Sequence, residues 1–345
     1  MPDILKLIPQ ADRLDFSQNF SIARPQYLGD TLFPDMKTQS LQAEYLRLAS
    51  GASLPVIASV HAFDTEAQIA SRPALDKVSV EKLLIKRKIN QTEKMRLLMN
   101  NGAGTDAQII GYVFDDMGRL ADAVKARTEL AKMEVLATGK MSIDENNLAM
   151  SVDYHVASEN TGFNFDWSES DADILGDIQK VVDVAAEKGQ AITGIVVSSK
   201  ILRQMRTNTR IQTYIFGSAG SGTLVTKSQL QALFGEQFGF SEINVNDQRY
   251  GQENDAGIIT TKRFFPENKV SFICKNPTGS VGAGLWGVTP EEESLGQYTE
   301  KSAQQFITLT QWATEDPVAV WTKASGLFIP VLPNPDGLFI ATVSV

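Results

Sequence analysis

Few residues in this chain have the types and spacings that catalysis requires. The two histidines, His61 and His155, are not at metal-ligand or triad spacing from cysteines or carboxylates. We expect His61 to pack in an apolar strand and His155 to be exposed. The single cysteine, Cys274, lies in an apolar run and is expected to be a small core residue, so no intrachain disulfide can form. The acidic run Glu291 to Glu293 is expected to be a solvated loop.

Three glycine-rich stretches match the glycine spacing of nucleotide-binding motifs. Each lacks the neighbouring residues or secondary structure that the motif needs to bind a phosphate. Gly217 to Gly222 has the first spacing of a P-loop but lacks the lysine and hydroxyl residue that follow, so we expect a loop tip. Gly282 to Gly287 fits the dinucleotide pattern, but Pro290 follows closely and favours a strand-connecting turn. Gly102 to Ala107 opens a helix outside any βαβ unit. The sequence therefore predicts no catalytic residue, metal or cofactor, although a nucleotide-binding enzyme stays an alternative.

Length and charge narrow the class of protein. A chain of 345 residues favours two lobes with extended segments. The net charge of −9 argues against a protein that grips nucleic-acid phosphates. No run approaches the ~18 apolar residues of a membrane span, and the N-terminus has no leader pattern, so we expect a cytoplasmic protein without a membrane partner.

The N-terminal third is expected to be extended and dependent on another surface. Residues 1–53 read as an arm, interrupted by a short helix over 38–48 in which apolar residues recur at helical spacing. Strands at 54–63 and 77–90 are expected to form a two-stranded ribbon, which is marginal alone in water. Four basic residues lie on its second half: Lys82, Lys86, Arg87 and Lys88. They contact a neighbouring subunit or form a solvated edge that blocks strand pairing, and the sequence leaves both interpretations open.

The strongest periodic signal predicts one long helix over 105–138. Apolar residues recur there at spacings of three and four, and the helix would span roughly 50 Å. Thr105 with Gln108 fits a capping box, Gly139 marks the C-terminal stop, and Asp115 with Arg119 can pair one turn apart.

The remaining chain predicts mixed elements. Strands at 141–143 and 148–156 form a hairpin, and 171–188 is an amphipathic helix with an acidic first turn that ends at Gly189. Helices at 200–211 and 228–234 alternate with strands at 192–197 and 269–274. Further strands are expected at 306–312, 318–323 and 338–345. Pro330, Pro333 and Pro335 are expected to interrupt the strand pattern between the last two. The fold class is α+β.

This order of elements resembles the Hong Kong 97-type fold of tailed-phage major capsid proteins. The lambda-type major capsid protein E family is similar in four landmarks that occur in the same order: Phe163 to Trp167, Phe265 to Val270, Gly284 to Gly287, and Asp316-Pro317. The resemblance implies an N-terminal arm (1–53), an extended loop (54–90), a peripheral domain (91–190) with its spine helix (105–138), an axial domain (191–295) and strands returning to the peripheral domain (296–345).

The resemblance also implies a function and partners. The chain would self-assemble into hexamers and pentamers that form an icosahedral shell around double-stranded DNA, which it contacts only weakly and non-specifically. It would do so in the host cytoplasm with a separate scaffold protein, a portal and a decoration protein. The basic ribbon would meet acidic residues of an adjacent subunit, for which the candidates are Asp171, Asp173 and Asp177. An encapsulin-like nanocompartment shell is the alternative within this fold.

Overall fold

The computed structural model describes residues 26–48, 75–91, 106–145, 148–217, 222–254, 257–293, 300–304, 306–315 and 318–345. Several sequence expectations lie outside these residues. They are the strand at 54–63, His61, the Thr105 cap, residues 102–105 of the Gly102 to Ala107 stretch and the middle of Gly217 to Gly222.

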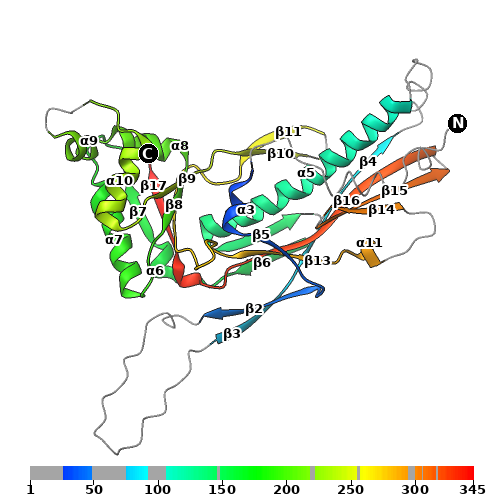
Figure 1. Ribbon diagram of the computed structural model, residues 1–345, viewed down its shortest axis with the longest axis horizontal. Helices are drawn as coiled ribbons and strands as arrows, with labels where there is room; N and C mark the ends of the chain where they lie inside the picture. The colour runs from blue at the N-terminus through cyan, green and yellow to red at the C-terminus, as the bar shows by residue number, and fades with distance from the viewer. Residues whose placement is uncertain are drawn as a thin grey trace, which may run out of the picture.

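The predicted long helix is present as α5 (Asp106–Thr138) and forms a spine through the molecule (Figure 1). Its apolar stripe is buried at Met117, Leu120 and Val124. The helix ends at Gly139, which takes a left-handed φ of 69° and donates its N–H to the Val135 carbonyl at 2.8 Å. The predicted Asp115–Arg119 ion pair is confirmed at 2.7 Å.

A six-stranded sheet packs along α5. Its path runs β1 (Asp35–Lys37), β13 (Ala283–Gly287), β16 (Val318–Val331), β15 (Ile307–Glu315) and β14 (Glu300–Gln304), and β4 (Leu83–Gln91) pairs with the other edge of β16. Val320, Ala324 and Phe328 alternate along β16 and share one core cluster with the spine helix. We call α5 and this sheet the spine lobe.

The N-terminal hairpin differs from the expected ribbon. Residues 42–48 form strand β2 (Gln42–Leu48) and not a helix, because they pair antiparallel with β3 (Leu75–Glu81). The expected strand at 77–90 is divided at Lys82 into β3 and β4, which join different sheets. A strand of the expected arm, β2, therefore pairs with a strand of the expected extended loop, β3.

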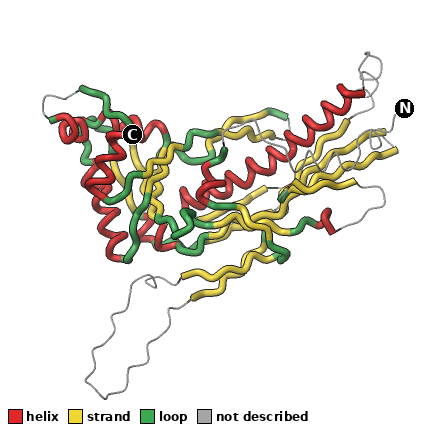
Figure 2. The backbone as a smooth tube through the Cα atoms, viewed as in Figure 1, coloured by secondary structure: helices red, strands yellow, loops and turns green. Residues whose placement is uncertain are grey.

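A five-stranded sheet forms the other lobe. Its order is β7 (Phe163–Asp166), β17 (Leu338–Ser344), β12 (Lys269–Ile273), β8 (Gly194–Val197) and β9 (Glu242–Val245). Four helices share its core: α7 (Ile174–Glu187), α8 (Ser199–Thr207), α9 (Thr209–Phe216) and α10 (Lys227–Phe238). We call this sheet and these helices the five-stranded lobe. Figure 2 shows the helices gathered at one end of the molecule, away from the free end of α5.

The two lobes share the five-stranded sheet. Phe272 belongs to the helix-covered core, whereas its neighbour Ile273 belongs to the core of the spine lobe, because successive side chains of a strand point to opposite faces. Ser271 donates its hydroxyl to the Leu136 carbonyl of α5 at 2.6 Å. The lobes are therefore joined through a buried, hydrogen-bonded contact.

Three details correct the expected layout. The last strand, β17, pairs with β12 in the five-stranded lobe, and residues 163–187 also pack there. Asn208 has extended ψ and divides the expected helix at 200–211 into α8 and α9. Pro330 lies inside β16, and Gly284 to Gly287 lie in strand β13 and not in a turn.

Shorter elements complete the chain. A helix α3 (Leu28–Leu32) precedes β1, and the predicted hairpin is present as β5 (Lys140–Glu145) and β6 (Leu148–Asp153). A second hairpin pairs β10 (Arg249–Glu253) with β11 (Ile259–Arg263). The remaining pieces are α6 (Ser158–Thr161), α11 (Pro290–Glu293) and η2 (Pro335–Gly337). No helix in the described ranges is long and apolar enough to cross a membrane.

Candidate interaction surfaces

Lys82 is a structural residue and does not belong to an exposed basic surface. Its side chain is buried, at 3% exposure, where the chain passes from β3 to β4. The ammonium donates to Thr38 Oγ1 at 2.6 Å and to the Ser40 carbonyl, and burial lowers the pKa of Lys82. The expectation that Lys82 contacts another subunit is therefore corrected: it fixes the crossing of its own hairpin.

The other three basic residues of β4 lie at the surface but already have partners. Lys86 Nζ lies 3.1 Å from Glu291 Oε1, and Arg87 Nη2 lies 2.6 Å from Glu253 of the β10–β11 hairpin. Lys88 Nζ lies 4.6 Å from the centre of the Trp321 ring. The strand thus presents a basic row in which Lys86 and Lys88 share one face and Arg87 points to the opposite face, each positioned by contacts within the chain.

Glu291 is a charged hub that sequence reasoning missed. The acidic run was expected to be a solvated loop, but it forms helix α11, and the Glu291 side chain is only 12% exposed. Glu291 Oε1 accepts from Lys86 and from Lys323 of β16, at 3.1 and 2.8 Å. Burial alone would raise the pKa of Glu291, but the hydrogen bonds outweigh it and bring the pKa to about 2. A carboxylate is thereby held ionised between two lysines from different strands.

An aromatic pair lies beside this hub. Trp312 and Trp321 are cross-strand partners on β15 and β16 and stack with ring centres 6.2 Å apart. Lys88 covers Trp321, and Lys323 lies 5.6 Å from the centre of the Trp312 ring. Both indoles are half-buried. Their matching alternation in the two strands was the sequence signal that could have found them. Tryptophan is enriched where proteins bind one another, whereas lysine is depleted there.

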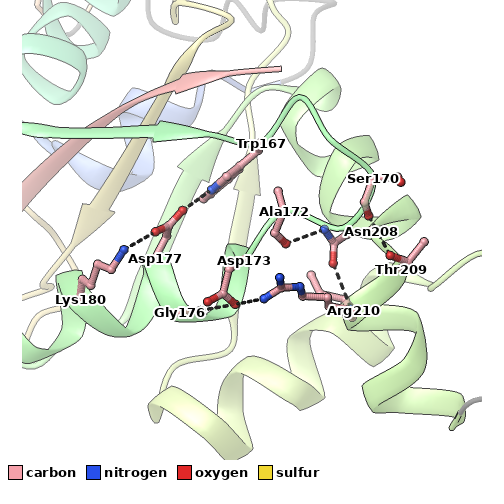
Figure 3. Close-up of polar contacts among 11 residues, drawn as sticks. Trp167, Ser170, Ala172, Asp173, Gly176, Asp177, Lys180, Asn208, Thr209 and Arg210 are labelled. Atoms are coloured by element: carbon pink, nitrogen blue, oxygen red, sulfur yellow. Dashed lines mark hydrogen bonds and ion pairs between the residues drawn. The ribbon is translucent and has the colours of Figure 1, made fainter.

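The acidic candidates lie around the start of α7: Asp171 and Asp173 on the turn before the helix, and Asp177 in its first turn. Figure 3 shows Asp173 and Asp177. Asp173 accepts from the Gly176 N–H at 3.4 Å as the N-cap and pairs with Arg210 at 3.3 Å. Asp177 accepts from the Trp167 indole at 3.0 Å and pairs with Lys180 at 2.8 Å. Asp171 is exposed.

Neighbouring segments hold this acidic turn in place. The Asn208 amide donates to the Ala172 carbonyl at 2.9 Å, and the Thr209 N–H donates to the Ser170 carbonyl at 2.7 Å (Figure 3). These hydrogen bonds fix the backbone of the turn, and the aspartate side chains extend from that fixed backbone.

The basic and acidic sets do not meet within one chain. Figure 1 places β4 along the spine lobe and α7 in the five-stranded lobe at the opposite end. The structure brings Lys86, Arg87 and Lys88 onto one strand, and Asp171, Asp173 and Asp177 around the start of α7. It does not bring the two groups together, so any contact between them requires two chains.

Cys274 and His155, which the sequence analysis weighed as possible catalytic or metal-binding residues, lie in a core and on the surface respectively. Cys274 is buried, and burial raises the pKa of its thiol to about 12, as expected for a core residue. His155 is exposed, as predicted, and its backbone N–H donates to Asp153 Oδ1 at 2.7 Å. Among the residues that the structure describes, no group of three or more histidine, cysteine or acidic residues is placed to hold a metal ion.

Comparison with known proteins identifies the family. The model of the phage major capsid protein E family matches residues 17–343. No curated protein matches.

Solved structures show the same fold at low identity. A putative capsid protein of a prophage of E. coli CFT073 is 15% identical with a TM-score of 0.58, and the match covers 99% of each chain. A phage-related protein from Bordetella bronchiseptica RB50 is 12% identical with a TM-score of 0.54 and 95% coverage of each chain. The mature capsid of bacteriophage PhiM1 is 10% identical with a TM-score of 0.50, covering 94% of this chain and 89% of the other. The chain therefore belongs to the lambda-type phage major capsid protein E family and is a structural protein of the capsid shell with the Hong Kong 97-type α+β fold.

Proposed function

We propose that copies of this chain assemble into hexamers and pentamers that close an icosahedral shell around packaged double-stranded DNA. The observation that carries this proposal is the family match over residues 17–343. The chain is a structural subunit without a catalytic step of its own. Assembly takes place in the host cytoplasm with a separate scaffold protein, a portal and a decoration protein.

The separation of the charged surfaces supports a head-to-tail contact between subunits. The basic row of β4 and the acidic turn before α7 lie on different lobes (Figure 1). A contact between two different patches is heterologous, and heterologous contacts close into rings when the rotation between subunits permits. We infer that Lys86, Arg87 and Lys88 of one subunit face Asp171, Asp173 and Asp177 of the next.

The net charge supports a weak contact with the enclosed DNA. At −9 the chain repels phosphates on average, and tight binding would require a basic patch that neutralises several of them. The DNA is therefore contained by the shell and not gripped by it.

Two alternatives have no observation in their favour. An encapsulin-like shell would share the fold, but the matching family is that of phage capsids. A nucleotide-binding enzyme would need Gly282 to Gly287 in a loop before a helix, whereas Gly284 to Gly287 lie in strand β13.

Electron microscopy tests the proposed assembly. The full chain is expressed alone and together with its scaffold protein, and hexamers or closed icosahedral particles are expected. A chain that stays monomeric under both conditions contradicts the proposal. Particles that hold a protein cargo and no DNA in infected cells would favour the encapsulin-like alternative.

A charge-swap experiment tests the subunit contact. Lys88 is the best position to change, because Lys86 and Arg87 also hold ion pairs within the chain. Lys88→Glu is expected to lower particle yield at least ~10-fold, and adding Asp171→Lys is expected to restore part of it, since opposite charges again face each other. Lys227→Glu makes the same charge change at an exposed position of α10 and should leave the yield unchanged. Normal yield from Lys88→Glu, or no rescue by the second change, would reject this pairing.

A further inference from the structure

A buried cluster of charged side chains fixes residues 28–37 to the spine helix. Glu129 and Lys132 of α5 are 1% and 0% exposed. Lys132 Nζ lies 3.0 Å from Asp30 of α3 and 2.9 Å from Asp35 of β1. One lysine therefore holds two consecutive elements of the arm against one turn of α5.

The Glu129 side chain holds the same arm by binding the backbone of Gly29. Both carboxylate oxygens lie 3.1 Å from the Gly29 N, whose N–H they accept. A side chain at Gly29 would collide with Glu129 Oε2, so the close approach depends on glycine. The carboxylate thus binds the first turn of α3 directly.

The charges in this cluster are unbalanced. With Glu129 ionised, the cluster holds three carboxylates and one ammonium, and a proton on Glu129 reduces the excess to one negative charge. β13 and β16 also pack here, and they contribute the uncharged Gly284 and Phe328 beside Lys132.

The same environment sets the titration of Glu129. Burial raises the pKa of Glu129, the Gly29 N–H and Lys132 lower it, and Asp30 and Asp35 raise it, which brings it to about 7. The group therefore titrates near neutral pH while the arm is docked.

We propose that Glu129 is a proton-operated latch: residues 28–37 stay docked on α5 while Glu129 carries a proton, and they loosen when that proton is lost. When the arm is undocked, the Glu129 carboxyl of α5 is hydrated and has an ordinary, lower pKa, so docking and protonation favour each other. Stabilisation of the docked arm is complete below the ordinary pKa and is lost as pH rises through about 7. This device belongs to the single chain, and it stands whether or not the proposed subunit contact is correct.

Hydrogen exchange of the full chain tests the latch. Protection of the amides of Gly29 to Phe33 is measured at pH 6 and pH 8, corrected for intrinsic exchange rates and for the amides of α7, with the assembly state checked by sedimentation. A single linked proton predicts about 10-fold greater protection at pH 6 than at pH 8. Equal corrected protection at the two pH values would overturn the proposal.

Glu129→Gln separates the proton from the hydrogen bond. The amide oxygen can still accept from Gly29 but cannot ionise, so the pH dependence is expected to disappear. Asp115→Asn removes an exposed carboxylate from the same helix and should keep the full dependence. A Glu129→Gln chain that keeps the 10-fold change would also overturn the proposal.

A second variant keeps the test decisive if Glu129→Gln fails to fold. Asp35→Asn removes a negative charge that raises the pKa of Glu129, so the midpoint of the protection change is expected to move to lower pH. A midpoint that stays in place or moves upward contradicts the proposed latch.

Discussion

The two lobes bury their sheets in different ways. The five-stranded sheet is covered on one face by helices and on the other by the core of the spine lobe, and all four residues of β8 are buried. The six-stranded sheet packs one face on α5, whereas its other face carries Trp312, Trp321 and Lys88 at the surface.

The helices of the five-stranded lobe are capped by side chains of that lobe. Each helix from α7 to α10 has a side-chain N-cap, supplied by Asp173, Ser198, Asn208 and Thr226. Side chains of the five-stranded lobe therefore accept from backbone N–H groups in the first turns of its own helices. The spine lobe leaves the half-buried rings of Trp312 and Trp321 at the surface, and tryptophan is enriched where proteins bind one another.

Removing a core ring should produce the largest loss of stability. Phe272 is 0% exposed in the five-stranded lobe, and Phe272→Ala is expected to lower the free energy of unfolding by about 3–5 kcal/mol. Trp321→Ala on the outer face should cost less than about 2 kcal/mol in the unassembled chain, since its ring is only half-buried. Urea unfolding of both variants measures the difference, and equal losses would break the comparison.

The Glu291 hub should give a smaller, pH-dependent effect. Glu291→Gln is expected to cost about 1–2 kcal/mol at pH 7, because charged hydrogen bonds from two lysines are lost. The pKa of Glu291 is lowered to about 2, so the difference from wild type should shrink as pH falls from about 4.5 through 2.

A matched control defines that effect. Glu253→Gln removes the exposed pair with Arg87 and should change stability by less than about 0.5 kcal/mol. Unfolding curves at pH 7, 4 and 3 test both variants. A Glu291→Gln difference that does not depend on pH would show that the hub acts through packing and not through charge.

The smallest expected effect concerns a cap of the five-stranded lobe. Asp173→Ala should cost about 1 kcal/mol, because the N-cap acceptor of α7 is lost, whereas Asp173→Asn should keep most of it. Asp171→Ala, two residues earlier on the exposed turn, should change the free energy of unfolding by less than about 0.5 kcal/mol. If both alanine variants cost the same, Asp173 is not a significant cap.

Local patterns were sufficient for elements that are stabilised by nearby residues. The period of α5, the glycine stops at Gly139 and Gly189, and the β5–β6 hairpin follow from contacts within a few residues. Strand β2 was mistaken for a helix because Leu41, Tyr45 and Leu48 recur at helical spacing. Its strand state depends on pairing with β3, about thirty residues later.

For the candidate interaction surfaces, too, local features could be predicted from the sequence and long-range contacts could not. Sequence alone located a basic strand and an acidic turn, because charge and turn signals are local. It could not show that Lys82 is buried, or that Glu291 joins Lys86 to Lys323, since those contacts join residues 32 or more positions apart.

The sequence by itself determined an α+β chain with a long helix, and the likeness of its landmarks to capsid proteins indicated the family. The tertiary structure decided which charges are exposed, which strand enters which sheet, and how the arm is fixed. The Glu129 cluster shows the physical reason. Its four side chains come from 30, 35, 129 and 132, and only burial in one place couples their charges and brings the pKa of Glu129 close to neutral.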